Sequence, residues 1–156
     1  MKNAFFYDTE IGAITIAENG TEVTDIYFGK EISPDFDVKE TQLIRDTYVQ
    51  ICEYLKGERK TFDVPLFTGG TDFQKRVWKA LEDIPYGETR SYQDIAKAAG
   101  NVKACRAVGM ANNKNPISII IPCHRVIGKN GKLVGYGGGL NIKEYLLKLE
   151  GGLRIE

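Results

Sequence analysis

The chain has few residues of the kinds that build metal centres and disulfide frameworks. Its 156 residues include one histidine, His124, and three cysteines, Cys52, Cys105 and Cys123. This odd and sparse set fits neither a disulfide framework nor any zinc-ligand spacing. We therefore expect no metal and no cofactor, and we expect the protein to work in a reducing compartment, the cytoplasm.

Long apolar runs and a net charge are also missing. No run approaches the roughly 18 apolar residues of a membrane-spanning helix, and the first residues lack the apolar core of a signal peptide. The zero net charge hides an asymmetry, because residues 1–70 hold seven Lys and Arg against 13 Asp and Glu, whereas residues 71–156 hold 14 against eight. Chance scatter of surface charge and a basic half that binds a polyanion explain this equally well.

In the first half of the chain, apolar and polar residues alternate in the way typical of strands, and the apolar residues then change to helical spacing. Segments 3–9, 11–18 and 22–29 predict three antiparallel strands, with a tight turn at Asn19-Gly20. Apolar residues then recur at helical spacing over residues 40–56, and Cys52 lies on that apolar stripe as a structural thiol. We place the domain boundary at Gly69-Gly70, which gives domains of residues 1–70 and 71–156.

The second half predicts short helices that follow one another closely. Thr71 or Asp72 caps a helix through Leu81, and Ser91 with Asp94 begins another that Gly100 closes. Residues 101–113 form the next helix, so that the two make a helix-turn-helix pair. We expect a last helix, capped by Asn141 with Glu144 reaching back, to run to Glu150.

The candidate chemistry lies in the segment "IIIPCHRVIG", residues 119–128. Pro122 ends a β-branched run, so we expect Cys123 at the end of a strand, facing a cleft. Arg125 adds a positive charge that would favour the nucleophilic thiolate. Glu150 at a helix C-terminus is disfavoured by the helix dipole, which suggests that it orients His124; the alternative is a carboxylate exposed to solvent.

The second helix of the pair combines small residues with cations. Small side chains allow close approach to a groove while Lys and Arg meet phosphates, and a tight helix–helix contact is the alternative. The small residues are Ala104, Ala107, Gly109 and Ala111, and the cations are Lys103, Arg106 and Lys114.

Over nearly all of residues 71–156 the chain resembles the O6-alkylguanine-DNA alkyltransferases. The matching segments, in the family's order, are "DFQKRVWKAL", "IPYGETRSYQDIA", "RAVGMANNKNP", "IPCHRVIG" and "GYGGGLNIKEYLLKLEG". The resemblance implies an α+β fold, with a small RNase-H-like N-terminal domain and a winged-helix C-terminal domain. The implied partner is duplex DNA that contains alkylated guanine, bound by a monomer.

The resemblance also implies roles for individual residues. Cys123 would accept the alkyl group, and His124 would deprotonate it through a water with Glu150 behind it. Asn115 would be the hinge before the active-site loop. Tyr92 would turn the nucleotide's phosphate and protonate the leaving guanine.

The remaining implied roles concern DNA and the extruded base. Arg106 would fill the gap that the flipped base leaves, and further DNA contacts are expected from Lys103, Ala104, Ala107 and Arg125. The carbonyls of Cys123 and Val126 would read the amino group of the base, within a pocket completed by Tyr136, Gly137 and Gly138.

Gly137 departs from the serine of some relatives, which would widen the pocket. The expected activity is single-use transfer of an alkyl group from O6-alkylguanine to Cys123, with O4-alkylthymine left open as a second substrate.

Two rival hypotheses remain: a DNA-binding regulator with a structural Cys123, and a thiol hydrolase or redox enzyme that uses the Cys-His pair.

Overall fold

A computed structural model of the chain describes residues 2–128, 130–131, 133 and 135–151. It divides into two compact units, which we describe separately. Unit 1 comprises Met1–Thr68 and Pro116–Ser118, and unit 2 comprises Gly69–Asn115 and Ile119–Glu156. Within the described residues, no helix has the length and apolar character needed to cross a membrane.

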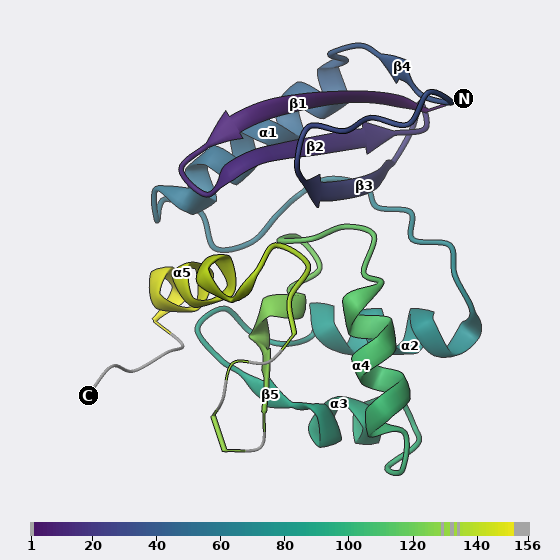
Figure 1. Ribbon diagram of the computed structural model, residues 1–156, viewed down its shortest axis with the longest axis vertical. Helices are drawn as coiled ribbons and strands as arrows, with labels where there is room; N and C mark the ends of the chain where they lie inside the picture. Colours follow the sequence, from purple (N-terminus) through teal and green to yellow (C-terminus); the bar gives the residue numbers. More distant parts are fainter. Residues whose placement is uncertain (1, 129, 132, 134, 152–156) are drawn as a thin grey trace. The chain divides into compact units, whose positions relative to one another are not determined.

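Unit 1 is a four-stranded sheet with one helix packed against it (Figure 1). The strands are β1 (Asn3–Thr9), β2 (Gly12–Glu18), β3 (Val23–Phe28) and β4 (Asp37–Val38), in the order β3-β2-β1-β4. The three predicted antiparallel strands are confirmed, and β4 adds a short parallel pairing with β1. Helix α1 (Gln42–Leu55) buries Ile44, Ile51 and Tyr54 and contacts β1 and β2.

The free edge of β3 pairs with a segment that is distant in sequence. Ile26 N–H donates to the Pro116 carbonyl at 2.9 Å, and Ser118 N–H donates to the Ile26 carbonyl at 3.0 Å. The chain therefore leaves unit 2 after Asn115, adds three residues to the sheet of unit 1, and returns to unit 2 at Ile119.

Unit 2 contains the helices α2 (Asp72–Glu82), α3 (Tyr92–Ala98), α4 (Cys105–Asn113) and α5 (Leu140–Glu150). The strands β5 (Arg90–Ser91) and β6 (Val126–Ile127) form a two-stranded parallel sheet. Helices α2, α3 and α4 pack on one another, and the Trp78 indole N–H of α2 donates to the Ala111 carbonyl of α4 at 2.9 Å. The predicted N-caps Thr71 and Ser91 are confirmed, each within a capping box.

Three local predictions are wrong. Helix α4 begins at Cys105 rather than Asn101, because the Asn101 side chain and carbonyl accept from Lys103 and Ala104 and close a turn instead. Helix α5 has Gly139 at its N-cap with no side-chain cap, and Glu144 pairs with Lys148 at 2.7 Å instead of reaching back. Residues 119–121 form turns, not a strand.

Candidate active site around Cys123

Cys123 begins a short 3-10 helix (Cys123–Arg125) that is tied to the end of α4 by asparagine side chains. The Asn115 amide donates to the Ile121 carbonyl at 2.7 Å, and the Asn112 amide donates to the Cys123 carbonyl at 3.4 Å. The two acceptors are the carbonyl of Cys123 itself and that of a residue two positions before it. These hydrogen bonds therefore attach the Cys123 loop to the C-terminal end of α4.

The loop also contains a strained residue. Ile119 has a φ of 74°, the one positive φ among the described non-glycine residues, and its side chain is buried. A β-branched residue in this region costs on the order of 1–3 kcal/mol. The packing around the buried side chain therefore holds this conformation against the local preference of isoleucine.

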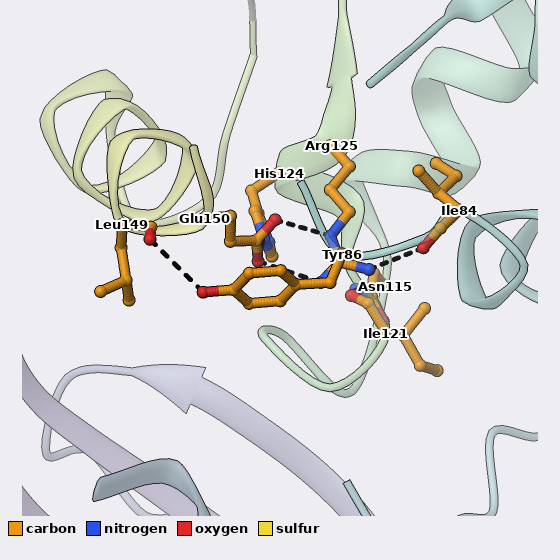
Figure 2. A network of polar contacts seen from close by, with 8 residues as sticks. All are labelled: Ile84, Tyr86, Asn115, Ile121, His124, Arg125, Leu149 and Glu150. Atoms are coloured by element: carbon orange, nitrogen blue, oxygen red, sulfur yellow. Dashed lines mark hydrogen bonds and ion pairs between the residues drawn. The ribbon is translucent and has the colours of Figure 1, made fainter. Parts of the chain in front are cut away.

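His124 and Arg125 share one buried carboxylate (Figure 2). The imidazole Nε2 lies 2.8 Å from Glu150 Oε2. Arg125 donates to the same carboxylate through Nε to Oε1 at 2.8 Å and through Nη2 to Oε2 at 3.0 Å. Its Nη1 donates to the Ile84 carbonyl at 2.7 Å. Glu150 thus orients His124 directly, as expected from its place at the end of α5.

Arg125 does not occupy the position predicted for a DNA contact. Its residue is only 7% exposed, and its guanidinium donates to Glu150 and Ile84 and lies 5.7 Å from the centre of the Tyr86 ring. The prediction failed because a buried carboxylate needs a compensating cation nearby. Arg125 supplies that charge, so we correct its assignment from a DNA contact to support of Glu150.

The environment of His124 favours the neutral imidazole. Complete burial lowers the pKa of His124, against the opposing influence of Glu150, and the charges of Arg125 and Lys143 lower it further. A carboxylate accepts only, so Nε2 carries the proton and Nδ1 keeps a lone pair. Nδ1 has no hydrogen-bond partner among the residues that the structure describes. His124 is therefore set up as a base.

The Cys123 thiol is buried, at 5% exposure, and its pKa is raised by that burial. A hydrogen bond from the Asn115 side chain and the positive charge of Lys143 act in the opposite direction. The cation that lowers this pKa is Lys143 rather than the predicted Arg125, whose guanidinium binds the Glu150 carboxylate instead. The thiol needs a base to ionise at neutral pH, which is the role open to His124.

Two tyrosines among the predicted site residues interact electrostatically with Cys123. They are Tyr92 at the start of α3 and Tyr136 in the glycine-rich loop, and burial raises the pKa of both hydroxyls. The Tyr92 ring lies beside Gly109, where an added Cβ would be 3.9 Å from it. Because 3.9 Å is an ordinary van der Waals distance, an alanine at position 109 would also fit beside the Tyr92 ring.

The other predicted residues lie at different levels of exposure. Val126 is buried, with its carbonyl bound to Lys143, while Gly137 is exposed and Gly138 half-buried. On α4 and the turn before it, Lys103, Arg106 and Ala107 are exposed and Ala104 is half-buried. Ala111 is instead buried against Trp78, so the helix–helix alternative holds for that residue.

Lys143 and Asn112 are polar residues of this site that the sequence analysis missed. Both are buried, and they bind the carbonyls of Val126 and Cys123 respectively. Lys143 lies seven residues before Glu150, a spacing that places the two on one face of a helix. Within the described part of the chain, no three His, Cys, Asp or Glu side chains are arranged to hold a metal ion.

Unit 2 combines a helix-turn-helix pair with a buried cysteine and a hydrogen-bonded pair of His124 and Glu150, which makes it a DNA-binding type of domain with a cysteine in its core. Residues 72–152 match the family model of the 6-O-methylguanine DNA methyltransferase, DNA binding domain. Residues 4–68 match that of the 6-O-methylguanine DNA methyltransferase, ribonuclease-like domain. The chain belongs to the 6-O-methylguanine DNA methyltransferase family.

Individual relatives agree with this assignment. A methylated-DNA–protein-cysteine methyltransferase of Methanosarcina acetivorans is 54% identical over 149 residues, covering 93% of this chain and 96% of the relative. The constitutive enzyme of Bacillus subtilis is 48% identical over 151 residues, covering 92% of each. The crystal structure of Mycobacterium tuberculosis OGT in complex with DNA matches with a TM-score of 0.90 and 48% identity, over 96% of this chain and 92% of that one.

Replacement of Arg125 by methionine tests its assignment to Glu150. Removing one partner of a buried ion pair leaves an uncompensated charge, so we expect Arg125→Met to lower the free energy of unfolding by about 3–5 kcal/mol in denaturant titrations. Arg90→Met is the matched control, because Arg90 pairs with Glu88 at 3.1 Å on the surface and should cost less than about 1 kcal/mol. Equal, small losses for both variants would contradict the assignment.

Proposed function

We propose that this protein repairs DNA by transferring an alkyl group from O6 of guanine to its own Cys123. The observation that carries the proposal is the hydrogen bond between buried His124 and Glu150, which holds a neutral imidazole next in sequence to the buried Cys123 thiol. A relay of this kind, in which a carboxylate orients the base of a nucleophile, is the general means of activating a weak nucleophile. Family membership and the exposed cations Lys103, in the turn before α4, and Arg106, in its first turn, agree with a DNA substrate.

The transfer balances as a single displacement. The thiol proton passes to Nδ1 of His124 through a water, the sulfur–carbon bond forms, and the bond between carbon and guanine O6 breaks. The departing guanine takes up one proton, which the Tyr92 hydroxyl donates. The product thioether has no base or leaving group that would reverse the step, so each molecule acts once.

The burial of Cys123 requires the damaged base to leave the duplex. A thiol with 5% exposure cannot meet a guanine that stays stacked, and enzymes that act on base edges extrude the nucleotide at a cost of a few kcal/mol. Arg106 would occupy the gap, while Lys103, Ala104 and Ala107 meet the groove. The carbonyls of Cys123 and Val126, with Tyr136, Gly137 and Gly138, would form the base pocket.

The chemistry also bears on the setting. An acceptor thiol must stay reduced, and Cys52, Cys105 and Cys123 are all free. We therefore place the protein in the cytoplasm. We infer that the protein is a monomer, because one chain supplies His124, Glu150 and Arg125 of the site.

Transfer of a labelled methyl group tests the acceptor. We expect label from duplex O6-methylguanine to reach the protein at no more than one methyl per chain, and Cys123→Ala to abolish it. Cys52→Ala and Cys105→Ala are matched controls that remove the other thiols and should keep full transfer. Mass spectrometry locates the label, and release of the label with repeated turnover would favour a thiol hydrolase instead.

Substitution of Arg106 tests base extrusion apart from chemistry. We expect Arg106→Ala to slow repair of duplex DNA by about tenfold or more, since extrusion costs a few kcal/mol, and to leave benzyl transfer from free O6-benzylguanine unchanged. Single-turnover rates measure both. Lys39→Ala removes an exposed cation from unit 1 and serves as the control. Equal slowing with the duplex and the free base would refute a role in extrusion.

A further inference from the structure

A groove between α2 and α3, the α2–α3 groove, lies in unit 2 apart from the Cys123 loop. Its volume is about 800 Å³, and α2, α3, β5 and the connection after α2 line it. Among the described residues, its lining includes none from α4 and none from the Cys123 loop. Sites for small ligands have volumes of this order. The α2–α3 groove is therefore a separate candidate binding site.

The walls of the α2–α3 groove are predominantly basic. Lys79 pairs with Asp83 at 3.4 Å and Arg90 pairs with Glu88 at 3.1 Å. Within the described part of the chain, the other three cations of the groove have no carboxylate within ion-pair distance. The five cations are Lys75, Arg76, Lys79, Arg90 and Lys97.

Two carboxylates, those of Asp83 and Asp94, also line the groove. Asp94 accepts from the Ser91 backbone N–H at 2.9 Å. Hydrogen bonds from Ser91 hold the pKa of Asp94 below its ordinary value, and the charges of Arg90 and Lys97 lower it further. A carboxylate thus already occupies the N-terminus of α3, where a phosphate would otherwise be attracted. The excess positive charge therefore suits dispersed carboxylates better than a phosphate group.

Apolar side chains form the floor of the groove. Ile84 and Ile95 line it and are only 3% and 2% exposed, and Ala80 and Ala98 lie beside them at its surface. A sugar-phosphate backbone would bury little apolar area on such a floor, whereas the apolar side chains of a peptide would leave water there. An apolar floor between cationic walls is complementary to a segment that carries both apolar side chains and carboxylates.

We propose that the α2–α3 groove binds an acidic peptide segment of a partner protein, whose carboxylates meet Lys75, Arg76 and Lys97 and whose apolar side chains pack on the floor. Arg76 is already oriented, because its Nε donates to the Ala99 carbonyl at the end of α3 at 3.0 Å. Less side-chain freedom is then lost when the peptide binds. Such a contact would recruit the protein to a partner through residues that α4 does not supply.

Fluorescence anisotropy with a labelled peptide tests the chemistry of the groove. The probe is a short Asp-rich peptide with a central Leu-Leu pair, and two matched peptides carry Lys for Asp or Ser for Leu. We expect saturable binding of the probe below about 1 mM that weakens as salt is raised. Both matched peptides should bind at least about tenfold more weakly. Absence of binding, or equal binding of the Ser peptide, would overturn the proposal.

Charge reversal tests the location. We expect the double variant Lys75→Glu/Lys97→Glu to bind the probe about tenfold more weakly or less, since each reversal replaces an attraction with a repulsion. Lys39→Glu/Lys114→Glu is the matched control, because it reverses two exposed cations outside the groove and should bind as the wild type. Both variants should keep benzyl transfer from free O6-benzylguanine. Equal affinity of the two variants for the probe would reject the groove.

Ala98→Glu provides a second arm if the reversal variant does not fold. It adds a carboxylate at the edge of the groove, where the side chain is exposed, and should weaken probe binding while removing no hydrogen bond. Unchanged binding in Ala98→Glu would also count against the site.

Amide chemical shifts in NMR spectra distinguish the groove from the surface that carries Arg106. We expect the probe to cause its largest shifts in α2 and α3. Largest shifts in α4 would overturn the proposal. So would displacement of the probe by unmodified duplex DNA combined with weaker DNA binding of Lys75→Glu/Lys97→Glu, because the groove would then be a nucleic-acid surface. Failure of methyl transfer to Cys123 would reject the proposed function and leave the peptide result standing.

Discussion

The buried carboxylate of Glu150, held between an imidazole and a guanidinium, is the interaction on which the site depends. Glu150 sits at the last turn of α5, where the helix dipole disfavours a negative charge, and its side chain has no exposed area. Arg125 makes this placement tolerable by donating two hydrogen bonds to it. With its charge balanced in this way, Glu150 can fix the tautomer of His124 without drawing a second proton onto the ring.

Burial shifts the pKa values of three groups at this site, the Cys123 thiol, the His124 imidazole and the Lys143 ammonium, in directions that suit one function. It raises the pKa of Cys123 and lowers the pKa of His124 and Lys143. A thiol that stays protonated until a base removes its proton is protected from adventitious reaction. The same burial keeps the imidazole neutral and able to act as that base. The hydrogen bond of Asn115 and the charge of Lys143 then limit the cost of forming the anion.

Much of the fold could be predicted because it follows from local signals. Alternation gave the strands of unit 1, and the capping residues Thr71 and Ser91 marked the starts of α2 and α3. The pairing of His124 with Glu150 was implied by the resemblance to the alkyltransferases, whereas the position of Glu150 at a helix C-terminus alone left a solvent-exposed carboxylate as the alternative. Asn141 is not the cap because it lies inside α5, whose N-cap position is occupied by Gly139 with a φ of 96° and no side-chain hydrogen bond.

The missed features depend on contacts between segments far apart in sequence. Arg125 read as a surface cation because only the carboxylate 25 residues later shows that it is buried. Lys143 carried no prediction for the same reason, since the carbonyls that it binds belong to the Cys123 loop and the glycine-rich loop. The pairing of Pro116–Ser118 with β3 likewise has no local signature.

Nitrogen NMR of the imidazole tests the central claim most directly, because His124 is the only histidine in the chain and its signals need no assignment. The account predicts a neutral ring at pH 7 with the proton on Nε2 and an unprotonated Nδ1. The depressed pKa requires that state to persist as the pH falls below 6.5, the ordinary value. An imidazolium at pH 7, or a proton on Nδ1 instead, would contradict the relay.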